Sequence, residues 1–421
     1  MDDGVTTEVM TPAGRELAVG GSVAPGYEGV RQAFERNFVE HGEVGAGFSL
    51  VHDGRQVVDL WGGVADVETG APYRDDSLQL VFSTTKGATA ICANLLAQRG
   101  ELDVDAPVAE YWPEFARAGK ADIPVRCLLC HQAGLPYIDA SLTLDQVLAW
   151  EPPVEALAAM TPMWEPGTAH GYHAVTYGWL VGEVVRRITG SSLGTFFADE
   201  VAGPLGLEFW IGLPDEQQDR VAPLTYRGLR RADAAGPDAD DEPVDLVTRV
   251  QALLGDAAHT LVRALGGTAN LALSADGVFN RPDVRAAELP AANGVTNARS
   301  VARMYAGTIG TVEGGPAAPL LTPEQVALAS TCQTSGADRV LVFETTFGQG
   351  FMTSSPFSPF GGAGSFGHPG AGGSVGFADP ENGIGFGYVM NRMLTNLAGD
   401  PRSRGLVTAV YDAIGVTPVF A

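Results

Sequence analysis

A serine and a lysine three residues apart are the first residues in the chain that could do chemistry together. Ser83 and Lys86 form the pattern SxxK, and Lys86 and Lys120 are the only lysines among 26 Lys and Arg residues. An arginine cannot lose its proton near neutral pH, whereas a lysine that is buried in a pocket can. The pair therefore indicates a candidate nucleophile, Ser83, with a candidate base, Lys86.

Apolar residues on both sides of this pair predict a buried helix. Leu78–Phe82 lead into Ser83, and the mainly apolar stretch Ala88–Leu96 continues to Gly100. Residues i and i+3 share one face of a helix, so the lysine amine is expected beside the serine hydroxyl. The same pattern also fits a serine that caps a helix and a lysine on the surface, so other motifs have to decide.

Composition limits the classes of protein and partner. The chain has 421 residues, of which 45% are hydrophobic and 18% charged, as expected for one large domain or two closely packed ones. A formal charge of −24 argues against nucleic acid or an anionic membrane as partner. The acidic N-terminus has no apolar targeting segment, and no run is long enough to span a bilayer. We therefore expect a cytoplasmic protein.

The cysteines give no sign of a disulfide framework or a metal site. There are four cysteines, and the CxxC formed by Cys127 and Cys130 has no second ligand pair. His170 and His173 are spaced i, i+3 but precede the helix expected next, which argues against a metal site there. We expect no metal and no other cofactor.

The pattern of elements predicts an α+β fold. Strand patterns and flanking helices occur near both ends of the chain, and the middle is mainly helical. We expect an antiparallel sheet domain from residues 1–77 and 303–421, with an inserted, mainly helical domain at 78–302. The individual predictions are helices at Tyr27–His41, Thr176–Thr189 and Gly405–Ile414, strands at Ala46–His52, Gln56–Gly63, Val340–Phe343, Ser374–Ala378 and Ile384–Val389, and loops at Tyr226–Glu242 and Ser354–Gly373.

A tyrosine on a loop before a helix is the second candidate for chemistry. Tyr172 follows a Pro-Gly turn and precedes the helix expected at Thr176–Thr189, which Gly190 closes. A phenol in a cleft can relay a proton if a neighbouring ammonium lowers its pKa. A packed tyrosine with a hydrogen-bonded hydroxyl fits the same pattern. His131 is interpreted as a structural histidine that organises a turn.

A glycine-rich approach to a strand is the third. In the stretch that starts with His368, Pro369, Gly370 and Ala371, backbone N–H groups can come close to a ligand, as half of an oxyanion hole requires. Gly372–Gly376 also matches GxSxG, which makes Ser374 a rival nucleophile. That motif needs a helix after the serine and a later histidine, but a strand and turn follow, and no histidine does. Ser374 is therefore interpreted as structural.

Taken in order, these three motifs resemble those of serine β-lactamases and penicillin-binding proteins. The chain is similar to the family VIII carboxylesterases, the esterase branch related to class C β-lactamases, over nearly its whole length. The resemblance implies a β-lactamase/transpeptidase-like fold with the site at the domain junction. It also implies Ser83 as the acylated nucleophile, Lys86 and Tyr172 as the proton-transfer pair, backbone N–H groups of Ser83 and Ala371 as the oxyanion hole, and His368 and Gly370 beside the substrate.

Two departures from the lactamase pattern bear on the substrate. His368-Pro369-Gly370 stands where lactamases have Lys-Thr-Gly, so the cation that binds a substrate carboxylate is missing. Ala174 stands where class C lactamases have an asparagine of the second motif. Both changes predict a serine carboxylesterase that hydrolyses small, neutral, short-chain esters.

Several alternatives stay open at this point. An acyltransferase would use an alcohol or amine in place of water, and a weak β-lactamase or amide hydrolase would use the same residues. A catalytically inactive binding module is disfavoured because Ser83, Lys86 and Tyr172 are all present. Homo-oligomerisation is also possible.

Overall fold

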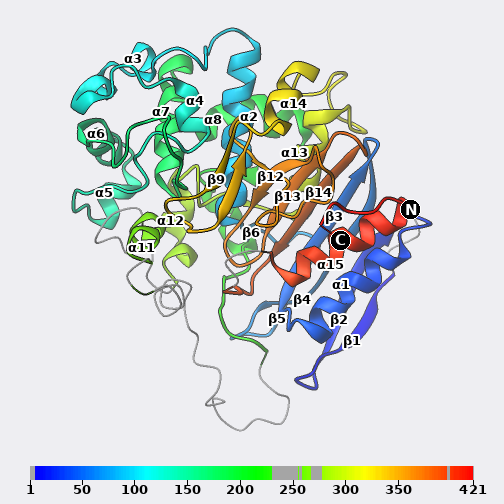
Figure 1. Cartoon of the computed structure of the whole chain (residues 1–421). Coiled ribbons are helices and arrows are strands. Elements are labelled where there is room, and N and C mark those ends of the chain that lie inside the picture. Colours follow the sequence, from blue (N-terminus) through cyan, green and yellow to red (C-terminus); the bar gives the residue numbers. More distant parts are fainter. Residues whose placement is uncertain (1–4, 230–254, 256–257, 267–276, 396–398, 421) are drawn as a thin grey trace.

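One antiparallel sheet, built from both ends of the chain, dominates the structure, which is a computed structural model that describes residues 5–229, 255, 258–266, 277–395 and 399–420. Its strands lie in the order β1-β2-β4-β3-β14-β13-β12-β11-β10-β9, and β5 pairs with β4 (Figure 1). The strands are β1 (Thr7–Met10), β2 (Glu16–Val23), β3 (Gly45–His52), β4 (Arg55–Asp66), β5 (Ala71–Pro72), β9 (Thr334–Ala337), β10 (Glu344–Phe347), β11 (Met352–Thr353), β12 (Phe366–Pro369), β13 (Val375–Asp379) and β14 (Ile384–Met390). The two chain ends meet where β3 pairs with β14.

Helices cover both faces of this sheet. α1 (Glu28–Glu40) and α15 (Pro401–Ala413) lie side by side on one face, and α13 (Ala298–Ile309) packs against β14, β3 and β13 (Figure 1). Close packing of α13 requires a glycine on β14, since a Cβ atom at Gly387 would lie 2.4 Å from the Ala298 carbonyl oxygen.

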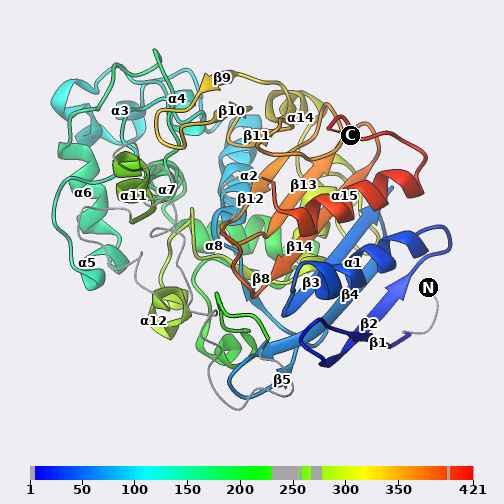
Figure 2. The same cartoon turned by 60° about the horizontal axis from the view of Figure 1, so that its bottom comes forward.

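The middle of the chain forms a mainly helical part beside the sheet. Its central helix, α2 (Thr85–Gln98), contacts α7 and α8 on one side and β12 of the sheet on the other (Figure 2). The remaining helices are α3 (Val108–Tyr111), α4 (Val125–Leu129), α5 (Leu144–Leu148), α6 (Glu151–Ala159), α7 (Thr176–Thr189), α8 (Leu193–Phe197), α9 (Gly203–Leu205), α11 (Ala258–Gly266), α12 (Pro282–Ala286) and α14 (Pro323–Ser330). A small sheet has the strand order β6 (Gln79–Leu80), β8 (Val295–Thr296) and β7 (Phe209–Trp210), and β6 precedes α2 in the chain.

The predicted α+β class, an antiparallel sheet flanked by helices, is confirmed. The helices predicted at Tyr27–His41 and Thr176–Thr189 are present, and Gly190 closes α7 with φ of 73°. The strands predicted at Ala46–His52 and Gln56–Gly63 are also present and pair as an antiparallel hairpin. The last helix starts earlier than predicted, at Pro401, because the Asp400 side chain caps it by accepting from the Arg402 N–H.

Two other predictions of elements, the strand Val340–Phe343 and the loop Ser354–Gly373, were wrong. Val340–Phe343 forms a turn between β9 and β10, because the Asp338 carboxylate accepts the N–H groups that a strand would pair. The predicted loop Ser354–Gly373 contains strand β12, and β1 and β2 were not predicted. The predicted loop Tyr226–Glu242 lies outside the described residues from position 230 onward.

The described residues include no helix that is long and apolar enough to cross a membrane.

The domain division proposed from the sequence needs one adjustment, because the boundary at residues 302 and 303 falls inside α13, which packs on the sheet. We therefore propose that the helical domain ends at Asn297, where the Asn297 side chain caps α13 by accepting from the Ser300 N–H.

Candidate active site

Ser83 lies in a tight turn at the start of α2. Phe82–Thr84 form a single 3₁₀ turn that runs directly into this helix. Phe82 has a φ of 45°, an unfavourable value for a residue with a side chain. Such strain persists where the surroundings enforce it, often at functional sites. The turn leaves Ser83 half-buried at the cleft, while Lys86, one turn later, is fully buried.

Lys86 is held at Ser83 by two backbone carbonyls. Its Nζ lies 3.1 Å from Ser83 Oγ, 2.6 Å from the Ala174 carbonyl oxygen and 3.0 Å from the Ala291 carbonyl oxygen. Burial lowers the pKa of Lys86 well below its ordinary value of 10.5. A neutral amine has two N–H groups and one lone pair. The two carbonyls can accept both N–H groups, which leaves the lone pair for the Ser83 hydroxyl proton.

The carbonyls that hold Lys86 could not be read from side-chain types. Ala174 lacks the amide that lactamases have at this point of the second motif, yet its backbone carbonyl contacts the lysine. Ala291 was missed altogether, because a backbone carbonyl leaves no mark on the sequence. One indirect signal was Asn293, which is buried and holds the turn around Ala291 by bonding to the backbone of Leu289 and Ala287.

Tyr172 reaches the same point from the helical part of the chain. The Lys86 Nζ lies 4.8 Å from the centre of the tyrosine ring. Burial raises the pKa of Tyr172, and a hydrogen bond to the Ser83 side chain opposes this only in part. The condition considered from the sequence, a neighbouring ammonium that lowers the pKa of this phenol, is therefore not met, because burial has the larger effect. The phenol keeps its proton at neutral pH and is equipped to donate it.

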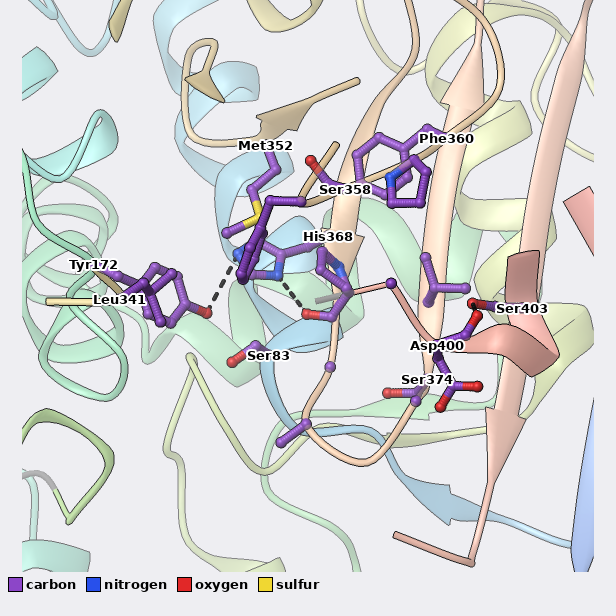
Figure 3. Close-up of a pocket in the computed structure, with 18 of the residues that line it drawn as sticks. Ser83, Tyr172, Leu341, Met352, Ser358, Phe360, His368, Ser374, Asp400 and Ser403 are labelled. Carbon is purple, nitrogen blue, oxygen red and sulfur yellow. Dashed lines mark hydrogen bonds between the residues drawn. The ribbon is translucent and has the colours of Figure 1, made fainter. Parts of the chain in front are cut away.

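His368 faces the Tyr172 hydroxyl from strand β12. Its Nδ1 lies 2.7 Å from the Pro369 carbonyl oxygen, which can only accept, so Nδ1 carries the hydrogen (Figure 3). Burial, with a smaller contribution from Lys86, lowers the pKa of His368 to about 3, so the ring is neutral at physiological pH. Its Nε2, which carries no hydrogen, lies 3.5 Å from the Tyr172 hydroxyl oxygen and can accept a hydrogen bond from the phenol.

The turn after His368 is fastened to the turn that carries Ser83. The Ser374 hydroxyl donates to the Val81 carbonyl at 2.9 Å and lies 3.1 Å from the Thr84 hydroxyl. A Cβ atom at Gly370 would lie 2.3 Å from the same Val81 oxygen, so only glycine fits there. These contacts agree with a structural Ser374. Ala371 lines the cleft, and no acceptor for its N–H occurs in the described parts of the chain.

The cleft at this point has a volume of about 140 Å³. Ser83 comes from the start of α2, Tyr172 from the helical part and His368 from the sheet, so all three meet between these two parts of the chain (Figure 3). Most of the other lining side chains are apolar: Leu261, Leu265, Leu341, Met352, Phe357, Phe360, Val375 and Val407.

The remaining histidines near the cleft have structural contacts. His131 Nδ1 accepts a hydrogen bond from the His173 N–H at 3.0 Å, and His173 Nε2 accepts one from the Leu135 N–H at 3.0 Å. Burial is the main cause that lowers the pKa of His173 to about 3. In the part of the chain that the structure describes, no group of His, Cys, Asp and Glu could hold a metal ion.

Comparison with known proteins identifies the family. Residues 30–409 match the family described as Beta-lactamase. The chain is 35% identical over 397 residues to Esterase/beta-lactamase LipL of Mycobacterium tuberculosis, which covers 91% of this chain and 85% of LipL. A crystal structure of a family VIII carboxylesterase is 37% identical with a TM-score of 0.79, over 94% of this chain and 99% of its own. EstA from Arthrobacter nitroguajacolicus Rue61a is 36% identical with a TM-score of 0.79, over 94% and 98%.

The chain therefore belongs to the β-lactamase family, and it has the β-lactamase/transpeptidase-like fold that its motifs implied. It is an enzyme of the serine hydrolase class within that family, and carboxylesterases are among its relatives.

Proposed function

We propose that this enzyme is a serine carboxylesterase that hydrolyses neutral, short-chain esters through an acyl-enzyme on Ser83. The observation that carries the proposal is the position of Lys86, buried between two carbonyls with its Nζ 3.1 Å from Ser83 Oγ. Relatives described as esterases over nearly the whole chain support the reaction class.

The proposed reaction begins with proton transfer from the Ser83 hydroxyl to Lys86. The serine oxygen attacks the ester carbonyl, and the N–H groups of Ser83 and Ala371 bind the oxygen that becomes negative. Tyr172 gives its proton to the departing alcohol and regains one from the Lys86 ammonium. Water then attacks the acyl-enzyme, and its proton passes back through the same pair to restore Ser83.

The preference for neutral esters rests on the charge of the cleft. His368 is uncharged at the position where lactamases have a lysine, and most lining side chains near it are apolar. A substrate carboxylate would lack a charge-assisted hydrogen bond worth about 1.5–3 kcal/mol.

The β-lactamase activity in the name of LipL makes lactam hydrolysis the second candidate. Acyl transfer, amide hydrolysis, a cytoplasmic location and homo-oligomerisation stay predictions from the sequence.

Paired substrates test this proposal directly. We expect kcat/KM for p-nitrophenyl acetate or butyrate to exceed that for a carboxylate-bearing β-lactam by at least about tenfold, the ratio that ~1.4 kcal/mol supplies. The His368→Lys variant should narrow this gap by improving lactam turnover. A wild-type enzyme that prefers the lactam would contradict the esterase assignment. Adding an alcohol or amine acceptor to the same assay would reveal acyl transfer.

The pH profile should report Lys86 and not His368. Because burial lowers the pKa of Lys86, the amine should become an active base well below pH 10.5. Ester kcat/KM should therefore rise with pH as Lys86 loses its proton, while His368, with a pKa of about 3, stays neutral from pH 5 upward. Stopped-flow or plate assays from pH 5 to 9 measure this. The His368→Gln variant should keep the acidic limb, and its disappearance would assign the limb to His368.

A further inference from the structure

A buried aspartate lies behind Tyr172, outside the cleft lining. Asp338 follows strand β9 and is 3% exposed. Its Oδ1 accepts hydrogen bonds from three backbone N–H groups, those of Tyr172 at 3.0 Å, Val340 at 2.8 Å and Leu341 at 2.8 Å. Its Oδ2 accepts from the Thr345 hydroxyl at 3.0 Å. Both oxygens are thus occupied, and the carboxylate is held rigidly.

The bond from the Tyr172 N–H to Asp338 joins the two parts of the chain that form the cleft. Tyr172 belongs to the helical part, whereas Asp338 begins the turn between β9 and β10 on the sheet. A second bond, from the Arg339 N–H to the His170 carbonyl at 3.1 Å, ties the same two segments together. A third contact, between His170 Nε2 and the Thr345 hydroxyl at 2.9 Å, joins these segments through side chains. The Asp338 carboxylate is the acceptor that reaches the backbone of Tyr172 itself, and hydrogen bonds to a carboxylate are the stronger kind.

The turn that Asp338 holds also contributes to the cleft. Leu341, whose N–H bonds to Asp338, lines the cavity beside Tyr172 (Figure 3). The next residue, Val342, has a φ of 59°, which is costly for a β-branched side chain. A turn with such a residue needs anchoring from its surroundings, and Asp338 supplies it through two N–H groups.

We propose that Asp338 is a positioning residue for proton transfer, which fixes the backbone of Tyr172 so that its phenol stays between Ser83 and His368. The inference rests on the proposed function, because it assumes that Tyr172 transfers a proton. The hydrogen bond between Asp338 and Tyr172 involves only the backbone of Tyr172, and Asp338 does not line the cleft. Asp338 therefore acts through Tyr172 and does not touch the reacting atoms.

Substitution of the carboxylate should lower turnover. In Asp338→Ala the N–H of Tyr172 loses its acceptor, and a shift of the phenol by about 1 Å can cost on the order of 10² in rate. We expect kcat for an alkyl ester such as ethyl butyrate, whose leaving alcohol needs a proton, to fall by roughly that factor, with KM changed by less than about threefold, because ester binding does not use the phenol proton. Asp338→Asn keeps an acceptor oxygen in place and should lose clearly less.

A double-mutant cycle separates positioning from a merely structural role. If Asp338 acts through Tyr172, the Asp338 substitutions should have little further effect on kcat in a Tyr172→Phe background, less than about threefold. Effects that multiply fully would overturn the proposal. If Asp338→Ala does not fold, the cycle with Asp338→Asn decides, since this variant preserves shape and one acceptor.

Asp379 provides a matched control at the far end of strand β13. It is also fully buried and holds a turn, by accepting from the N–H groups of Glu381 and Asn382. Asp379→Ala should lower the unfolding temperature, while any change in kcat should be the same with and without Tyr172. A control that couples to Tyr172 as strongly as Asp338 would overturn the proposal. If Tyr172→Phe alone leaves kcat unchanged, the proposed proton transfer fails, and this outcome is distinct from a failure of the Asp338 cycle.

Discussion

Ser83→Ala should abolish ester hydrolysis and covalent labelling by a fluorophosphonate, with a loss of activity on the order of 10⁶. Several serines line the described cleft, and Ser83 is the one whose hydroxyl lies 3.1 Å from the Lys86 amine. Its hydroxyl is the proposed nucleophile and the group that is acylated, so removing it removes both functions. Intact-protein mass spectrometry after labelling, followed by peptide mapping, locates the adduct. Ester hydrolysis that survives the Ser83→Ala substitution would mean that another residue is the nucleophile.

Ser374→Ala is the matched control for this prediction. Ser374 lines the same cleft and sits in a GxSxG match, but its hydroxyl is occupied with the Val81 carbonyl and the Thr84 hydroxyl. We expect this variant to bind the fluorophosphonate at Ser83 with unchanged stoichiometry and to keep most of its turnover. Because the lost bonds fasten the turn at Gly370, a moderate fall in stability is expected. A labelled peptide containing Ser374 would reverse the assignment.

The local part of this site could be predicted from the sequence because it depends on one helix. A spacing of three residues brings Ser83 and Lys86 together in any helical turn, and apolar neighbours indicated that this turn is buried. Tyr172 and His368 join the pair from segments far apart in the chain. Only their resemblance in type and order to a known family placed them at the cleft.

The parts that were missed act through the backbone or by an exception to a pattern. Ala174 and Ala291 hold Lys86 with carbonyl groups, which every residue has. The apolar run Val340–Phe343 has the pattern of a strand, because short continuous apolar runs are typical of buried strands. In the structure an aspartate before it accepts the N–H groups of Val340 and Leu341 and bends the run into a turn. An aspartate that starts such a turn was the available signal.

Lys86→Arg should be almost as damaging as Lys86→Ala although it keeps the positive charge. Loss of a positioned base typically costs about 10²–10⁴ in rate, and a guanidinium stays protonated at any pH at which the protein is folded. The space is also shaped for one amine, with carbonyl oxygens of Ala174 and Ala291 at 2.6 and 3.0 Å from Nζ. Fluorophosphonate labelling rates and ester kcat measure the loss. Activity near the wild-type level would mean that the proton of Ser83 takes another route.

Lys86→Met tests whether the Lys86 amine is neutral in the folded protein, through the pH dependence of the free energy of unfolding. Since burial lowers the pKa of Lys86, the folded protein holds this amine neutral over a pH range in which the unfolded chain, with a pKa of 10.5, binds a proton. Unfolding then takes up a proton, so wild-type stability should rise with pH towards 10.5. Methionine has nothing to titrate, so the stability of Lys86→Met relative to wild type should fall as pH increases from 6 to 9. Urea unfolding of both proteins measures this difference, and a difference independent of pH would mean that Lys86 is protonated in the folded enzyme and cannot act as the base.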